Sequence, residues 1–201
     1  MRTARSRSLT FILLAVGLPS LALAHTGHDH VMGFMQGLAH PTGGLDHLLA
    51  MIAVGLLAGR AGGSSLWRIP TSFIAMMMCG TLIGMAAIPL PSIEAGIAVS
   101  IVAFGLLLTA NRNPALMLTT LLVGFFALFH GHAHGSEAAE NISGLAYAAG
   151  LLSMSAALHA VGAAIAMMLV RQTVHGATTL RLSGAAFAAA GLGLFAGLLQ
   201  I

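Results

Sequence analysis

Charge is the scarcest property of this 201-residue chain: 6% of its residues are charged, and no lysine is present. An average soluble domain is about 25% charged, so this chain has too little polar surface to cover a folded core in water. Disorder is excluded by the same figures, because disordered chains combine low hydrophobicity with high charge. The absence of lysine also excludes a P-loop nucleotide site and Schiff-base chemistry.

Cysteine is nearly absent as well, since Cys79 stands alone and allows no internal disulfide. Because Cys79 lies in an apolar run, we expect a small buried side chain. Apolar residues are abundant instead: they make up 58% of the chain, and the mean hydropathy is +0.95. The bilayer is therefore the expected solvent.

The first 24 residues have the pattern of a cleaved secretory signal peptide. Three arginines form a positive n-region, residues 9–18 form an apolar h-region, and Ala22-Leu23-Ala24 matches an A-x-A cleavage site. We predict a leader over residues 1–24 and one membrane domain over residues 25–201. An uncleaved first helix is the alternative.

Long apolar segments follow, separated by Gly, Pro and Arg. They predict an all-α membrane protein with six transmembrane helices, over residues 31–59, 70–88, 92–110, 115–134, 144–170 and 182–201. The first segment is too long for one straight span and contains Pro41, Gly43 and Gly44, so we expect a break there. Several glycine pairs have GxxxG spacing, which is either a helix-packing pattern or chance in a glycine-rich chain.

The arginines predict the orientation. Those beyond the leader all fall in the loops after spans 1, 3 and 5, at Arg60, Arg68, Arg112, Arg171 and Arg181, whereas the acidic residues fall on or toward the other side. The positive-inside rule then places both mature termini on the outer side of the membrane. Since these five arginines are balanced by five acids, the pI of about 10.5 gives no reason to expect a nucleic-acid partner.

Ten histidines share the chain with only five acids, and most of them gather in three clusters. The first cluster, with His25, His28 and His30, stands at the predicted mature N-terminus. A freed amine and nearby imidazoles suit divalent nickel, copper, zinc or cobalt, so His25 and His28 are candidate metal ligands. A flexible polar tail is the alternative.

The second cluster contains His40, Asp46 and His47, which the span prediction places inside the hydrocarbon. A carboxylate at that depth is costly unless a cation or an imidazolium accompanies it, and broken helices frame ion sites in transporters. We therefore predict metal ligands here. The alternative is a helix-capping aspartate beside incidental histidines.

The third cluster lies at the outer end of the fourth span. On a helix, His130, His134 and Glu137 share one face, while His132 points away from it toward another helix or the headgroups. Two imidazoles and a carboxylate suit a divalent transition metal, although a polar outer loop is the alternative. The orientation prediction places this cluster and the second one at the same membrane face.

Two further histidines stand alone. His159 lies near the middle of the fifth span, where it is either a relay site or a neutral histidine bonded to a helix carbonyl. His175 is expected in a solvated cytoplasmic loop.

The H-x₅-D-H run from His40 to His47 and the F-H-G-x-A-H-G-x-E run from Phe129 to Glu137 resemble the motifs of the HupE/UreJ family of hydrogenase/urease accessory membrane proteins. The predicted leader and the histidine-bearing mature start fit the same pattern, so the resemblance covers essentially the whole chain. It implies a nickel or cobalt permease of the bacterial inner membrane, with its mature termini in the periplasm. By the resemblance, its functional residues fall on His40, Asp46, His47, His130, His134 and Glu137.

We therefore predict a secondary transporter rather than an enzyme, with nickel or cobalt as the transported ion and no permanently bound cofactor. The expected partners are the metal ion, membrane lipid and hydrogenase or urease maturation proteins; the oligomeric state is open. Two alternatives stay open, an intramembrane zinc hydrolase with Glu137 as its base and a metal donor that does not transport.

Overall fold

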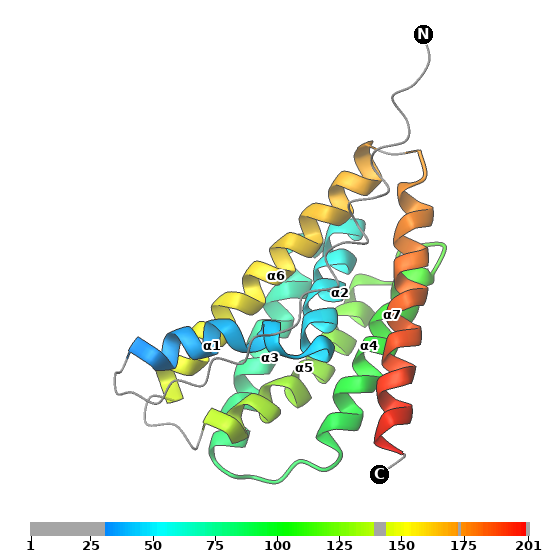
Figure 1. Ribbon diagram of the computed structural model, residues 1–201. Helices are drawn as coiled ribbons and strands as arrows, with labels where there is room; N and C mark the ends of the chain where they lie inside the picture. The colour runs from blue at the N-terminus through cyan, green and yellow to red at the C-terminus, as the bar shows by residue number, and fades with distance from the viewer. Residues whose placement is uncertain (1–30, 139–143, 173, 200–201) are drawn as a thin grey trace.

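The structure, a computed structural model, describes residues 31–138, 144–172 and 174–199. The predicted leader, with His25 and His28, lies outside the described residues. Within them the chain is helical, and the helices are α1 (Val31–Gly43), α2 (Leu45–Ala61), α3 (Ser65–Met85), α4 (Ile93–Thr109), α5 (Leu116–Ala138), α6 (Gly144–Gln172) and α7 (Gly176–Leu198). Figure 1 shows them as one bundle in which α2 stands among the others.

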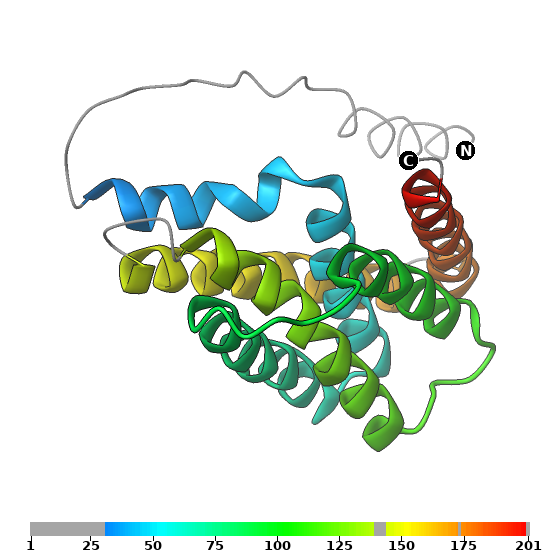
Figure 2. The same ribbon diagram turned by 90° about the horizontal axis from the view of Figure 1, so that it is seen from below.

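The predicted break of the first span is present at Gly44. This residue has extended backbone angles, φ −111° and ψ 126°, and the axes of α1 and α2 meet at 84°. Pro41 stays within the last turn of α1. In Figure 1 and Figure 2, α1 lies along the first half of α6, and α2 turns away from it into the bundle. The break therefore places the first turn of α2 inside the protein.

The exterior of the bundle is apolar, as expected of a protein in lipid. Leu82, Leu106, Phe125 and Leu192 each have more than half of their side-chain surface exposed. Among the described residues, α3, α5, α6 and α7 are long and apolar enough to cross a membrane, and the bent pair α1–α2 is a fifth candidate. Because α4 has 17 residues, the lower limit of about 17–25 for a span, six crossings remain a prediction.

Glycines bring helix backbones into close contact. A Cβ atom added at Gly80 or Gly84 of α3, or at Gly131 or Gly135 of α5, would overlap a carbonyl oxygen of the other helix. Gly55 and Gly59 approach α6 in the same way. The GxxxG spacing is thus a packing pattern here. The exception is the pair Gly193 and Gly197 of α7, where an added Cβ would meet no described atom of another helix within 4 Å.

Two arginines stabilise the C-terminal end of α4. Arg60 donates to the carbonyl oxygens of Leu108 and Ala110 at 2.7 and 2.5 Å, and Arg181 Nε donates to that of Thr109 at 3.2 Å. Cations suit this position because the last helical carbonyls lack partners and carry partial negative charge. The C-terminal ends of α2, α4 and α6 and the N-terminal ends of α3 and α7 lie in the upper part of Figure 1. The five arginines belong to these ends or to the connection after α4, and we call this the arginine end.

Cys79 differs from its expectation, because it is exposed. The buried positions of α3 include Phe73, Met77, Gly80 and Gly84, which follow the helical spacing of one face. Cys79 lies off that stripe, on the apolar exterior.

Candidate metal site

Four histidine rings from three helices lie against one another near the break. We call His40, His47, His130 and His134 the histidine cluster. The ring centroids of His47 and His134 are 4.4 Å apart, those of His47 and His130 are 5.0 Å apart, and those of His40 and His134 are 4.7 Å apart. The sequence motifs around residues 40–47 and 129–137 therefore meet in space.

An open hollow of about 700 Å³ leads to the histidine cluster. Its lining includes Gln36, His40, Asp46, His47 and Tyr147. His130 and His134 lie behind it and are almost fully buried, with 0% and 1% of their surface exposed. The cluster therefore extends from an accessible rim into the dry interior of the bundle.

Asp46, in the first turn of α2 after the break, fixes the orientation of His47. The Asp46 carboxylate oxygen Oδ1 accepts the backbone N–H of His47 at 2.8 Å and faces its ring Nδ1 at 3.0 Å. The proton of a neutral His47 ring then belongs on Nδ1, since that nitrogen faces the carboxylate. The other nitrogen, Nε2, is buried and has no hydrogen-bond partner among the described residues. His47 thus presents a lone pair, and Asp46 positions it.

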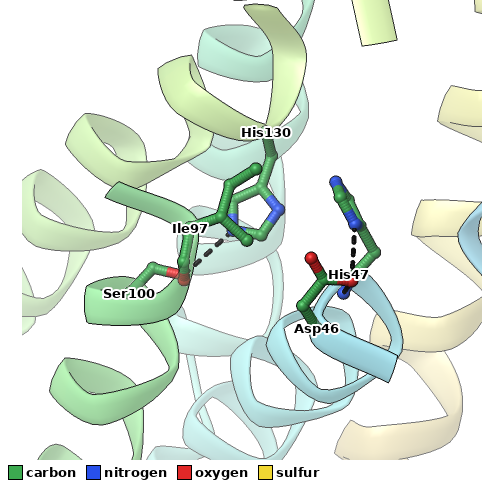
Figure 3. A network of polar contacts seen from close by, with 5 residues as sticks. All are labelled: Asp46, His47, Ile97, Ser100 and His130. Atoms are coloured by element: carbon green, nitrogen blue, oxygen red, sulfur yellow. Dashed lines mark hydrogen bonds and ion pairs between the residues drawn. The ribbon is translucent and has the colours of Figure 1, made fainter. Parts of the chain in front are cut away.

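Ser100 of α4 orients the His130 ring in the same way. Its hydroxyl donates to the Ile97 carbonyl at 2.6 Å, and its oxygen lies 2.9 Å from His130 Nε2. Because the hydroxyl proton is already used, Nε2 must carry the proton of that contact, and His130 Nδ1 keeps its lone pair. Nδ1 is buried without a described partner, and Figure 3 shows it on the side of the ring that faces His47.

Histidines that bind metals usually donate their second ring N–H to a carboxylate or another acceptor, which fixes the tautomer. His47 and His130 both have this arrangement. The ring nitrogens that could bind a metal do not yet point at one common position. In the described part of the chain, no group of three His, Cys, Asp or Glu side chains is arranged to hold an ion. Binding an ion would therefore require the rings to turn toward one another.

His132 has a different environment from its two neighbours in the motif. It is buried, and its Nε2 lies 2.7 Å from the carbonyl oxygen of Ile88 in the connection between α3 and α4. The predicted orientation away from His130 and His134 is therefore confirmed. Its contact serves to hold this connection against α5.

Three predicted ligands lie beyond what the structure describes. His25 and His28 precede its first residue, and the Glu137 side chain is not described although its backbone belongs to α5. They stay predictions.

Two residues near the site were not predicted from the sequence. Ser100 is a polar residue in the apolar middle of α4, between Glu94 and Thr109 near its ends, and this was the available signal. The Tyr147 ring lies 5.7 Å from that of His40, and it is the single tyrosine of the chain. Neither the position of Ser100 nor the rarity of tyrosine indicates which residue is contacted, because His130 and His40 belong to other helices.

Comparison with known proteins agrees with the motifs. The family model described as HupE / UreJ protein matches residues 13–194. Protein HupE of Rhizobium leguminosarum bv. viciae is 39% identical over 189 residues, which cover 94% of this chain and 97% of that protein. No solved structure matches the chain.

Proposed function

The chain belongs to the HupE/UreJ family of hydrogenase/urease accessory proteins, and from that premise we propose that it is a secondary transporter that imports divalent nickel or cobalt across the inner membrane. The metal would supply the maturation of a nickel or cobalt enzyme. The family relationship supports the choice of metal and the transport process, and the histidine cluster supports the route of the ion.

The observation that carries the proposal is the histidine cluster itself. Four imidazoles are gathered within a bundle whose exterior is apolar, and two of them are oriented by Asp46 and Ser100 so that a ring nitrogen keeps its lone pair. Ionisable residues within a membrane mark ion pathways by default. Neutral imidazole binds both nickel and cobalt, which are neighbours in the affinity series, so the donor set alone does not separate these two ions.

In this proposal the ion enters from the open hollow and exchanges water for imidazole stepwise. His25 and His28 would capture it outside, His40 and His47 would receive it at the rim, and His130, His134 and Glu137 would hold it further inside. Exchange among neighbouring ligands keeps binding reversible, as permeation requires. An inside-negative potential contributes about 4.6 kcal/mol per 100 mV for two charges, which is sufficient to drive import without nucleotide hydrolysis.

The direct test is uptake of radioactive nickel by cells that lack their own nickel importers. We expect His47→Ala and His134→Ala to lower the initial uptake rate at least about tenfold, because each removes an imidazole from the cluster. His175→Ala is the matched control, since His175 is an exposed histidine at the start of α7. Immunoblots of membrane fractions normalise the rates to the amount of protein.

Normal uptake by both cluster variants would refute the proposed route. The two alternative functions give different results in the same material. A zinc hydrolase would retain a stoichiometric ion through purification and turn over a peptide or lipid. A metal donor would bind nickel without accumulating it in cells.

A further inference from the structure

His159 of α6 is buried in an environment that leaves it unsatisfied. Its side chain is 1% exposed, and neither ring nitrogen has a hydrogen-bond partner among the described residues. A bond to a helix carbonyl, the structural role considered from the sequence, is therefore not observed. An unsatisfied buried polar group costs about 1–3 kcal/mol, and such a group in a native structure requires an explanation.

The ring of Phe73 contacts both His159 and the histidine cluster. Its centroid is 5.6 Å from that of His130 and 5.1 Å from that of His159. Phe73 is fully buried. His130 and His159 are therefore both in contact with the same apolar ring.

His159 also lines a second cavity, of about 300 Å³, between α3 and α6. The lining includes Leu66 and Pro70 from the first half of α3 and Ala163 from α6. Along α6, His159 stands twelve residues after Tyr147 of the open hollow, which corresponds to about 18 Å. The cavity thus lies toward the arginine end, whereas the open hollow lies at the histidine cluster.

We infer that His159 is a second metal-binding station beside Phe73, where it takes a divalent transition-metal ion from the histidine cluster and releases it into the cavity between α3 and α6. This inference rests on the proposed transport function and adds the inner half of the route. It requires the Phe73 ring, which contacts both His130 and His159, to move so that the ion can pass from one imidazole to the other.

The transfer is a ligand exchange without redox chemistry. The bond from the ion to a cluster imidazole breaks as a bond to a His159 nitrogen forms, and a water molecule then takes the place of His159 on the ion. One imidazole binds an ion more weakly than several do, so the inner station favours release. Conduction needs such a site, which is favourable enough to enter and weak enough to leave.

The experiment uses the purified full chain in proteoliposomes with an inside-negative potential and radioactive nickel outside. A wash with a chelator removes external nickel, so that ions in the lumen are counted separately. Nickel bound at equilibrium by the same protein in detergent is measured in parallel. The variants are His159→Leu, which replaces the imidazole by an apolar side chain of similar size, and His159→Cys, which provides a different metal ligand at the same position. His175→Leu is the control.

We expect His159→Leu to bind nickel like the wild type and to lower the rate of appearance in the lumen at least about tenfold, with part of the rate recovered in His159→Cys. Equal rates in the Leu and Cys variants would overturn the inner station, because a structural role does not depend on ligand chemistry. Parallel loss of binding and transport in His159→Leu would overturn it as well.

Failure of the inference is distinguishable from failure of the proposed function. If the wild type transports nickel and His159→Leu transports it equally, the inner station is wrong and the transport function stands. If the wild type brings no nickel into the lumen, the transport function is wrong and the inner station falls with it.

Discussion

The two ends of the bundle hold polar side chains in opposite ways. At the arginine end, Arg60 and Arg181 use their donors on carbonyl oxygens at the end of α4. At the histidine cluster, His47 and His130 each engage one ring nitrogen and leave the other buried without a described partner. Both sets of side chains are held in place, but one set retains donor atoms for a ligand.

This difference separates structural polar groups from functional ones. A guanidinium has donors and no lone pair to offer a metal, so it serves a helix end well. A neutral imidazole has one donor and one acceptor, so a single hydrogen bond on the donor leaves the acceptor aimed elsewhere. The following substitutions either remove this difference or sharpen it.

The largest effect is expected from Asp46→Asn, which keeps the shape of the side chain and removes the charge that orients His47. Loss of a partner that positions a metal ligand typically costs 10–100-fold, so we expect nickel uptake to fall by roughly that factor. Thr42→Ala, at an exposed residue near the same break, is the control. Uptake by Asp46→Asn equal to that of Thr42→Ala would show that the carboxylate does not position the ligand.

A smaller loss is expected from Ser100→Ala, because it removes the acceptor of the His130 Nε2–H while leaving every cluster imidazole in the chain. We expect nickel affinity in detergent and uptake in cells to fall together by about tenfold. Ser153→Ala removes another helical serine that donates to a backbone carbonyl, Ala149 at 2.7 Å, on the exposed side of α6. If both serine variants bind nickel like the wild type, the assigned tautomer of His130 has no role in binding.

The smallest effect on uptake is expected at the arginine end. Arg60→Gln removes charged hydrogen bonds to the end of α4, so the purified protein should lose about 2 kcal/mol of stability, measured by unfolding in detergent. Uptake per inserted molecule should stay unchanged. Arg68→Gln is the control, since the Arg68 guanidinium lies 5.2 Å from the exposed ring of Trp67. A loss of uptake in Arg60→Gln without a loss of stability would contradict the distinction between the two ends.

Much of the fold could be predicted from the sequence, because hydropathy reports the helices directly. The break at Gly44 followed from Pro41, Gly43 and Gly44, and α4 and α6 begin and end within two residues of the predicted spans. The number of crossings did not follow, because α4 is at the lower limit of length. The environment of Cys79 did not follow either, since both faces of α3 are apolar and hydropathy alone does not distinguish lipid from core.

The site was predictable within each helix and not between helices. Spacing along α5 separates His132 from His130 and His134, and the structure confirms that separation. The contacts of Ser100 with His130 and of Phe73 with His159 depend on how helices cross. No spacing rule within one segment contains that information, so these residues emerge only once the helices are packed.

The partners of His47 and His130 belong to different parts of the chain, and this has a mechanical consequence. Asp46 is the preceding residue of the same helix, so the carboxylate travels with His47 through any rigid displacement of α2. Ser100 belongs to α4, whereas His130 belongs to α5, so a slide of one helix along the other parts their 2.9 Å contact. His130 then loses the neighbour that holds its proton on Nε2. The affinity of His130 for an ion therefore depends on how α4 and α5 are aligned.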